Sequence, residues 1–533
     1  MPLDARRPAS LQEHFDDLYT TVYSLIDDAK QDYELLKLYK GSHSAYDPHP
    51  EVCQFMRFFA RTHKGLFSYA VDNHPPIPDT LDEFDEHRLP RISLRAAFDL
   101  LASTERRPGE TIAEFLSFLT TRRHRLSRYR GGSSGYGDEA RAVAAAHFRK
   151  AGIPTSPDQV LVTCGGAKGI FLEFCAALMC RHESERVHRM SGRLLAPSGY
   201  YQSLRVVAPL FGGTLDCVDQ LTGSAVSDWL AETSTVRGRA LYVPLVNNVD
   251  GRVLERDRAH GIAATVLEHN RRNPNNPVHV LGDDVYVASY LDGSVTPTPI
   301  GSVTGDELGD PALGGMHYWT VSVVTSSKTF ALPTSRVAFA TTANPALRAG
   351  MDHYRTMLSH GRVPQGDELA AAAALCLTPA AWIDGWNRHY ARRVEWLRTQ
   401  LALLNHELGQ LAFHLTPPQG GWYAALRISA ELFDDTRVRS SVHALAVLLH
   451  YGCDQPSSGI AMLPGELAGY TVDPSRPEFV LRANLAVSDD ERVQFVDRLR
   501  DCAHHLRGPD ARRVIDHALK RAHAAVDLDR IAA

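Results

Sequence analysis

Apolar side chains near the start of the chain recur at spacings of three and four residues. This spacing places them on one face of a helix, and it involves Leu11, Phe15, Leu18, Tyr19, Val22, Leu25 and Ile26. We therefore expect residues 10–39 to form a helical extension that packs on the body of the protein. A helix that binds a partner is the alternative interpretation. Residues 81–126 show a second, mostly helical pattern.

From residue 158 onward, short apolar runs alternate with helical stretches. The runs predict strands at residues 160–163, 194–196, 214–218, 240–245, 278–281, 320–324 and 336–340. Helical stretches, such as those at 168–179 and 259–269, separate several of these runs. Alternation of this kind predicts an α/β fold with a mostly parallel sheet and helices on both faces.

The pattern changes again beyond residue 344. The chain is largely helical to about residue 404, and it then predicts a smaller α+β unit with strands near 422–426, 459–463 and 478–486 and a last helix over 510–531. We therefore expect three parts: a helical N-terminal extension over residues 1–80, a large domain over 81–344 and a small C-terminal domain over 345–533.

The composition narrows the classes of function. With 44% hydrophobic and 22% charged residues, the chain is typical of a soluble globular protein. The net charge of −5 gives no electrostatic reason to expect a nucleic acid or an anionic membrane as partner. The eight cysteines form no CxxC pair, which argues against a zinc site or a dithiol redox site. Scattered thiols and a charged N-terminus without an apolar run predict a cytoplasmic protein without a metal.

The strongest chemical signal is a lysine at the end of an apolar run. Lys328 follows the hydroxyl residues Thr325 and Ser327, and Arg336 comes eight positions later. A lysine amine forms an imine with an aldehyde and can carry a proton at a substrate α-carbon. Hydroxyls and a guanidinium hold a phosphate by charge-assisted hydrogen bonds. The alternative for this string alone is a solvated surface lysine.

A second signal follows the apolar run at 278–281. Asp283 sits where a parallel strand would end, and ligands of open α/β sheets bind beyond such ends. Its carboxylate is suited to hold a pyridine nitrogen in the protonated form. Tyr286, three residues on, would reach a ring hydroxyl. The alternative is an ordinary Asp-Asp turn.

Small residues lie between a predicted strand and a predicted helix at Gly165, Gly166 and Ala167. Small side chains allow the backbone N–H groups of a helix N-terminus to approach a phosphate. The stretch lacks the GxxxxGK[ST] pattern of a Walker loop. A glycine pair at a strand–helix turn also has a purely structural explanation.

Two further polar residues follow or interrupt apolar runs. Asn248 follows the strand predicted at 240–245, and its amide is suited to donate to a ring oxygen, although a turn would also explain it. Arg482 lies inside the apolar run 479–486, where a buried guanidinium is costly unless it is paired. A bidentate grip on a substrate carboxylate would explain Arg482, as would an internal salt bridge.

The order of these signals resembles the class I and II aminotransferases, which are enzymes of fold type I that depend on pyridoxal 5′-phosphate (PLP). The stretch Thr-Ser-Ser-Lys-Thr-Phe-Ala-Leu-Pro at residues 325–333 is close to the SxSKTFALPGxRxG string of that family. The resemblance covers roughly residues 125–505. It runs through five motifs in order, which centre on Gly165-Gly166, Asn248, Asp283-x-x-Tyr286, Lys328 with Arg336, and Arg482.

The resemblance implies a role for each of these residues. Lys328 would hold PLP as a Schiff base and carry the proton, with Asp283 and Tyr286 as its catalytic partners. The implied contacts are Asp283 to the pyridine nitrogen, Tyr286 and Asn248 to the ring oxygen, Arg482 to the substrate α-carboxylate, and Gly165, Gly166, Ala167, Thr325, Ser327 and Arg336 to the phosphate. The resemblance further implies a homodimer, in which Tyr129 would reach the neighbouring subunit's phosphate.

The chain departs from the family at two places. The family's Asn-Pro-Thr-Gly is here Asn248-Val-Asp-Gly, which adds Asp250 near the ring. The aromatic that stacks on the ring is replaced by Gly199, with Tyr200 or Tyr201 as a shifted substitute, and we assign Tyr200.

Amino-group transfer between an amino acid and a 2-oxo acid is therefore the leading hypothesis. The alternative is a PLP-dependent lyase, or a β- or γ-replacement or carbon–carbon bond-forming enzyme of specialised metabolism, acting on an amino acid-derived substrate such as S-adenosylmethionine. A non-catalytic role is a third interpretation. The leading hypothesis predicts a buried Lys328 within reach of Asp283 and Tyr286, and one anion site shared by Arg336 and Gly166.

Overall fold

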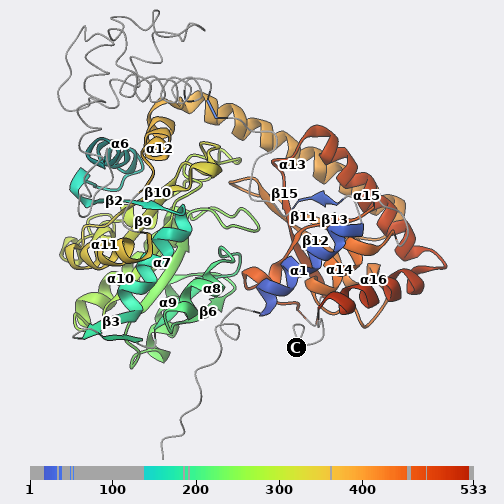
Figure 1. The fold of residues 1–533 in the computed structure, drawn as a ribbon, viewed down its shortest axis with the longest axis horizontal. Coiled ribbons are helices and arrows are strands. Elements are labelled where there is room, and N and C mark those ends of the chain that lie inside the picture. Colours follow the sequence, from blue (N-terminus) through green and yellow to red (C-terminus); the bar gives the residue numbers. More distant parts are fainter. Residues whose placement is uncertain are drawn as a thin grey trace, which may run out of the picture.

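The part of the chain that the structure describes forms two bodies, and the long helix α13 (Ala380–Leu408) runs alongside both of them (Figure 1). The computed structural model describes residues 17–32, 35–38, 48, 49, 52, 137–183, 186–189, 192–359, 363–452, 458–473, 475 and 477–526. The helical stretch expected at 81–126, Tyr129 and the expected domain boundary at residue 80 lie outside these residues. No helix within these ranges is both long and apolar enough to cross a membrane.

The larger body is built on a seven-stranded sheet, as the alternating pattern predicts. Its strands lie in the order β2 (Val160–Cys164), β10 (Val337–Thr341), β9 (Thr320–Thr325), β8 (Val278–Asp283), β7 (Arg239–Pro244), β5 (Arg193–Pro197) and β6 (Thr214–Val218). Only β10 pairs antiparallel with its neighbours. Every residue of β7 and of β9 is buried, as in a sheet with both faces covered.

Helices complete the larger body. α7 (Ala167–Met179) packs against α11 (Pro345–Ser359), and α6 (Gly137–Lys150) packs against α12 (Gln365–Leu377). The other helices of this body are α8 (Leu204–Leu210), α9 (Gly223–Glu232) and α10 (Arg256–Arg272). Because α11 lies against α7, the chain remains with the large sheet for some distance beyond the boundary that we expect at residue 344. That boundary stays a prediction.

Among the described residues, the smaller body holds a four-stranded sheet with helices packed on it. The strand order is β11 (Phe413–Thr416), β12 (Tyr423–Ser429), β15 (Glu478–Asn484) and β14 (Leu463–Pro464), with every pair antiparallel. The helices are α14 (Ser441–His450), α15 (Asp489–Arg507) and α16 (Ala511–Ala525). The strands and the last helix predicted from the sequence are thus present, although the run at 459–463 is divided between β13 (Ile460–Ala461) and β14.

The described part of the N-terminal extension packs on the smaller body. α1 (Asp17–Asp32) contacts α14 and α16, and it lies beside these C-terminal helices in Figure 1. The predicted apolar face is buried, with Val22, Leu25 and Ile26 fully inaccessible. β1 (Leu36–Lys37) then pairs in parallel with β13. The expectation that this helix packs on the body is therefore confirmed.

Candidate active site

A cavity of about 450 Å³ opens between the carboxyl ends of the large-sheet strands and the smaller body. Most of the residues selected from the sequence line it, namely Ala167, Asn248, Asp283, Tyr286, Thr325, Ser327, Lys328, Arg336 and Arg482. Its other lining residues are Tyr19, Tyr23, Lys168, Tyr201, Gln202, Val246, Val285, Pro333 and Tyr423. This is the position at which open α/β sheets bind their ligands.

Lys328 follows the end of β9 and reaches toward the smaller body. Its Nζ donates a hydrogen bond to the hydroxyl of Tyr423 at 3.3 Å. It also lies 5.8 Å from the centre of the Tyr286 ring and 5.9 Å from that of Trp422. The predicted proximity to Tyr286 is thus present. Lys328 is only partly buried, which is less than we expected, because its side chain borders the cavity.

Asp283 ends β8, beside the strand that leads to Lys328. Its side chain is buried, and Oδ2 accepts a hydrogen bond from the hydroxyl of Tyr242 on β7. The N–H of Val285 approaches Oδ1 at 3.5 Å. Burial raises the pKa of Asp283 to about 6, while the Tyr242 hydrogen bond and the charge of Lys328 act in the opposite direction. A carboxylate in such a place is suited to pair with a protonated ring nitrogen.

Tyr286 lies in the loop after β8 and is 3% exposed. Its ring packs edge-on against Trp422, with 5.0 Å between the ring centres. Burial, and then the neighbouring Tyr423, raise the pKa of Tyr286 well above its ordinary value. The hydroxyl therefore stays protonated and is suited to donate a hydrogen bond to an oxygen in the cavity.

The predicted meeting of Arg336 with the glycine turn is present. Arg336 Nη2 donates to the carbonyl oxygen of Gly165 at 2.7 Å, and a Cβ on Gly166 would lie 3.2 Å from the same nitrogen. The N–H groups of Gly165 and Gly166 both donate to the Arg336 carbonyl, at 2.7 and 2.8 Å. The two glycines thus fix the arginine, and their own amides are already used.

Donors for an anion remain next to this turn. Ala167 and Lys168 open α7 and line the cavity, and the first N–H groups of a helix have no partner within it. The Oγ of Ser327 is buried and has no hydrogen-bond partner among the residues that the structure describes. With the Arg336 guanidinium, these groups form a donor set that suits a phosphate.

Asn248 and Asp250 follow β7 and differ in where they point. The Asn248 amide lines the cavity and donates to Gln202 Oε1 at 3.2 Å. Asp250 does not line it; its Oδ2 accepts from Arg252 Nε at 2.6 Å and from the Tyr470 hydroxyl at 2.8 Å. The extra acid of this chain is thus paired away from the cavity.

The structure distinguishes the two tyrosines that follow Gly199. Tyr201 lines the cavity, and its ring lies 6.1 Å from that of Phe171. Tyr200 is buried outside the cavity lining, and its hydroxyl accepts from Arg205 Nη1 at 3.2 Å. The sequence led us to Tyr200, whereas the cavity places Tyr201 beside the other selected residues.

Arg482 extends from β15 into the cavity and is 4% exposed. Its guanidinium carbon lies 4.2 Å from the centre of the Tyr423 ring. Sequence reasoning selected Arg482 but missed Tyr423, and it also missed Tyr242. Both tyrosines stand in buried strands, where an aromatic residue is indistinguishable from an ordinary core residue.

The N-terminal helix contributes two side chains that sequence reasoning did not place in the site. Tyr19 and Tyr23 of α1 line the cavity, and their ring centres are 4.8 Å apart. Burial raises the pKa of the Tyr19 hydroxyl, as do the neighbouring phenols of Tyr23 and Tyr201. An aromatic cluster therefore lines the same cavity as the lysine.

The mostly parallel sheet, the smaller antiparallel body and the lysine between them define a fold-type I enzyme that depends on PLP. The chain matches the model of the family "Aminotransferase class I and II" over residues 124–499. It belongs to that family, and it is a PLP-dependent aminotransferase. The residues around the cavity fit the cofactor, since the buried Asp283 suits its ring nitrogen and the free donors near Arg336 suit its phosphate.

Similar proteins agree with this family. An aspartate aminotransferase from Streptomyces avermitilis is 26% identical over 367 residues, which cover 67% of this chain and 78% of that protein. In fold, the chain resembles an aspartate aminotransferase mutant from Thermus thermophilus (TM-score 0.58, 18% identity, 94% of this chain and 100% of that one). It also resembles the N-succinyldiaminopimelate aminotransferase of Mycobacterium tuberculosis (TM-score 0.58, 18% identity, 93% and 99% covered).

Proposed function

We propose that Lys328, Asp283 and Tyr286 form the catalytic centre for amino-group transfer from an amino acid to a 2-oxo acid. One observation carries the proposal. Asp283 ends β8 and Lys328 follows the adjacent parallel strand β9, and both side chains line the same cavity as Arg336. When bound, PLP supplies an aldehyde that exchanges amino groups and a ring that delocalises the electrons released at the substrate α-carbon.

The residues of the chain then have separate tasks. Asp283 keeps the ring nitrogen protonated, and Tyr286 and Asn248 donate to the ring oxygen. Lys328 Nζ takes the proton from the α-carbon of the amino acid and later returns it. Arg336, Ser327, Thr325 and the amide of Ala167 hold the phosphate, with Gly165 and Gly166 fixing Arg336. Tyr201 replaces Tyr200 as the proposed stacking residue.

Arg482 is proposed to bind the α-carboxylate of the substrate, and we propose that the substrate side chain lies toward Tyr19 and Tyr23, which line the same cavity. Their aromatic rings favour an amino acid with an aromatic or other uncharged side chain. A second candidate is an acidic amino acid, because Lys168 also lines the cavity and one similar protein is named an aspartate aminotransferase. For an aromatic or uncharged amino acid, Tyr19 and Tyr23 would meet the end of the substrate side chain. For an acidic amino acid, Lys168 would meet it.

Half-reactions test both the function and the substrate. The protein loaded with PLP is mixed with one amino donor at a time, and both the cofactor absorbance and the 2-oxo acid are measured. We expect one equivalent of 2-oxo acid per site, with L-phenylalanine or L-tyrosine faster than L-aspartate. A faster reaction with L-aspartate that is lost in Lys168→Met would support the acidic candidate. Release of ammonia or CO₂ without an amino form of the cofactor would support the lyase alternative, which no comparison favours.

We further propose a homodimer in the cytoplasm. A second hollow, of about 1000 Å³, lies along α6 and the start of α13, and Val143, Phe330 and Ile383 are among its apolar lining residues. Phe330 is two positions from Lys328, so a second copy seated there would border the active site. Sedimentation of the purified protein tests this, with a single species at monomer mass as the contrary result.

A further inference from the structure

Tyr423 joins two groups that come from different bodies of the fold. Its hydroxyl accepts the hydrogen bond from Lys328 Nζ, and its ring carries the Arg482 guanidinium on its face. Lys328 follows a strand of the large sheet, whereas Tyr423 and Arg482 belong to the small one. Tyr423 thus contacts both the proposed proton carrier and the proposed carboxylate anchor.

The strand register explains why Tyr423 and Arg482 meet. In the antiparallel pair of β12 and β15, Tyr423 lies opposite Asn484, and Ala425 lies opposite Arg482. Directly opposed residues share a face of the sheet, so Tyr423 and Arg482 are diagonal neighbours on the face toward the cavity. The small Ala425 leaves space for the guanidinium to lie over the ring.

The charges around Tyr423 act on its hydroxyl. Burial would raise the pKa of this phenol, but the positive charges of Lys328 and Arg482, together with the hydrogen bond from Lys328 and the neighbouring hydroxyl of Tyr286, lower it below the ordinary value. The charged or titratable groups acting on it are therefore Lys328, Arg482 and Tyr286. Two of the three are cations, which favour negative charge on the Tyr423 oxygen.

We propose that Tyr423 is a positioning residue for the amino-group transfer, which receives the released ε-amino group of Lys328 and holds it at the α-carbon of a substrate anchored by Arg482. This inference rests on the roles proposed above for Lys328 and Arg482. When Lys328 Nζ takes the α-proton, it becomes an ammonium group with three N–H donors. The Tyr423 oxygen accepts a hydrogen bond from one of these N–H groups. Its ring, stacked on the guanidinium, keeps Arg482 in place to bind the carboxylate of the same substrate.

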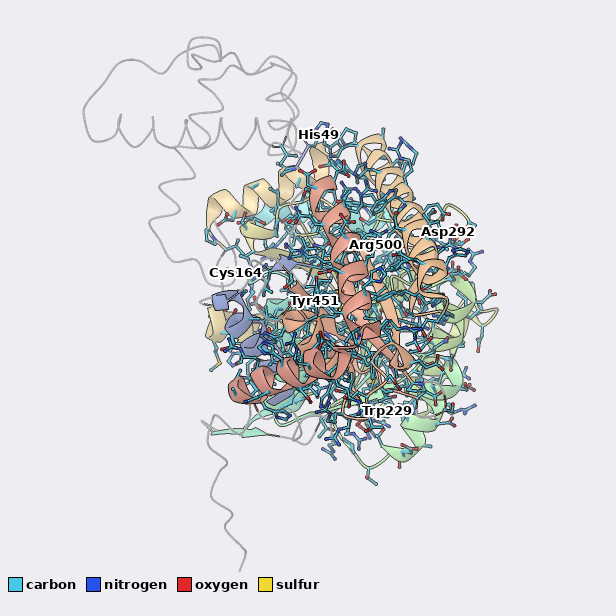
Figure 2. The ribbon with its side chains drawn as sticks, turned by 90° about the vertical axis from the view of Figure 1, so that its right-hand side faces the viewer. His49, Cys164, Trp229, Asp292, Tyr451 and Arg500 are labelled. Atoms are coloured by element: carbon cyan, nitrogen blue, oxygen red, sulfur yellow. The ribbon has the colours of Figure 1, made fainter. Side chains whose placement is uncertain are left out.

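The first experiment uses the protein without PLP, so it does not depend on turnover. Ionisation of tyrosines is followed by ultraviolet absorbance as the pH is raised. We expect one tyrosine to ionise below the others, and this step to be absent in Tyr423→Phe. Tyr451→Phe is the matched control, because Tyr451, which Figure 2 labels, is a buried tyrosine at the end of α14 and is not among the residues that line the cavity.

The link to the lysine is tested by Lys328→Met, with Lys328→Gln as a second variant if the first does not fold. Removing this positive charge should move the early tyrosine step to higher pH, by about one unit for the loss of one adjacent charge. If the Tyr423 hydroxyl did not contact Lys328, the step would stay unmoved, and the split between kcat and KM in Tyr423→Phe tests whether the contact serves the reaction. An early step that persists in Tyr423→Phe, or that does not shift in either lysine variant, overturns the proposal.

Kinetic measurements distinguish the contribution of the Tyr423 hydroxyl from that of its ring. Tyr423→Phe keeps the surface under Arg482, so kcat should fall by about tenfold to a hundredfold with KM nearly unchanged, as expected for a lost hydrogen bond to a charged group. Tyr423→Leu also removes the ring and should raise KM. Equal effects of both variants on KM alone would contradict the proposal. If the wild-type protein fails to transfer amino groups, the proposed function fails, whereas the tyrosine titration still reports on Tyr423.

Discussion

The hydroxyl of Tyr242 on β7 donates a hydrogen bond to Oδ2 of Asp283 on β8. The two residues stand on adjacent parallel strands, and Tyr242 is fully buried with its ring 5.8 Å from that of Phe171. This contact occupies one oxygen of the carboxylate and leaves Oδ1 for a group in the cavity. We therefore propose that Oδ1 is the oxygen of Asp283 that meets the cofactor.

Replacing Tyr242 by Phe should weaken the binding of PLP. The ring and its packing remain, but the lost donor leaves the charged form of Asp283 less stable, so the pKa of Asp283 rises further. We expect the Kd for PLP at pH 7 to increase by about tenfold, the size of one lost hydrogen bond to a charged group. Titration of the protein with PLP, followed by visible absorbance, measures this. Tyr354→Phe, in a buried tyrosine of α11, should leave the Kd unchanged.

Replacing Asp283 by Asn should stabilise the protein without PLP while abolishing tight cofactor binding. The folded-state pKa of about 6 lies above the usual value of about 3.9, so the folded state binds the proton more strongly. The carboxyl group therefore costs no stability below pH 4, and the cost grows as the pH rises to 6 and then stays constant. At pH 7 the two-unit difference corresponds to about 3 kcal/mol at most.

Urea unfolding of Asp283→Asn and wild type at pH 4 and pH 7 measures that effect. The stabilisation should appear at pH 7 and shrink toward pH 4. A variant that is less stable than wild type at both values would show that the carboxylate is needed for folding rather than for the cofactor.

Replacing Asp284 by Asn should stabilise the protein and leave PLP binding intact. Burial, followed by the charge of Asp283, raises the pKa of Asp284 to about 8, so this group also costs stability at neutral pH. Asp284 does not line the cavity. The variants Asp283→Asn and Asp284→Asn thus distinguish the effects of the two neighbouring carboxyl groups on PLP binding. Loss of PLP binding in Asp284→Asn would mean that the cofactor site extends to Asp284.

Replacing Gly166 by Ala should disturb the phosphate site. Gly166 has φ of +68°, and its added Cβ would lie 3.2 Å from Arg336 Nη2. Gly409 is the control, because it has φ of +67° at the end of α13 but nothing within 4 Å of an added Cβ. Both alanine variants should lose about 1–2 kcal/mol of stability from the left-handed backbone. Only Gly166→Ala should raise the Kd for PLP, and an equal Kd in both would place the phosphate elsewhere.

Much of the site could be predicted because its residues follow strands in a fixed order. Asp283 ends one strand with a strong apolar pattern, Lys328 comes three residues after another, and Arg336 directly precedes a third; the ends of neighbouring strands meet at one edge of the sheet. The cofactor and the family follow from this arrangement, and the family match confirms them.

Other parts of the site could not be predicted, for physical reasons. Whether Tyr200 or Tyr201 faces the cavity depends on the turn at Gly199, whose φ of +89° redirects the chain. Tyr423 joins the site through its register with β15, and no local pattern encodes that pairing. The spacing of apolar residues in α1 predicted that it is helical and which of its faces is buried. It could not predict that the face packs on α14 and α16, which lie far away in the sequence.

The docking of α1 has a consequence for how the enzyme is made. Its partners α14 and α16 come more than 400 residues later in the chain, and its neighbour β1 pairs with β13, so these contacts close very long loops. During synthesis, the large sheet is available well before the helices that receive α1. The part of the cavity that Tyr19 and Tyr23 line is therefore among the last to be completed. A chain that stopped before α16 would already contain Lys328 and Asp283 in place, but this side of the cavity would be incomplete.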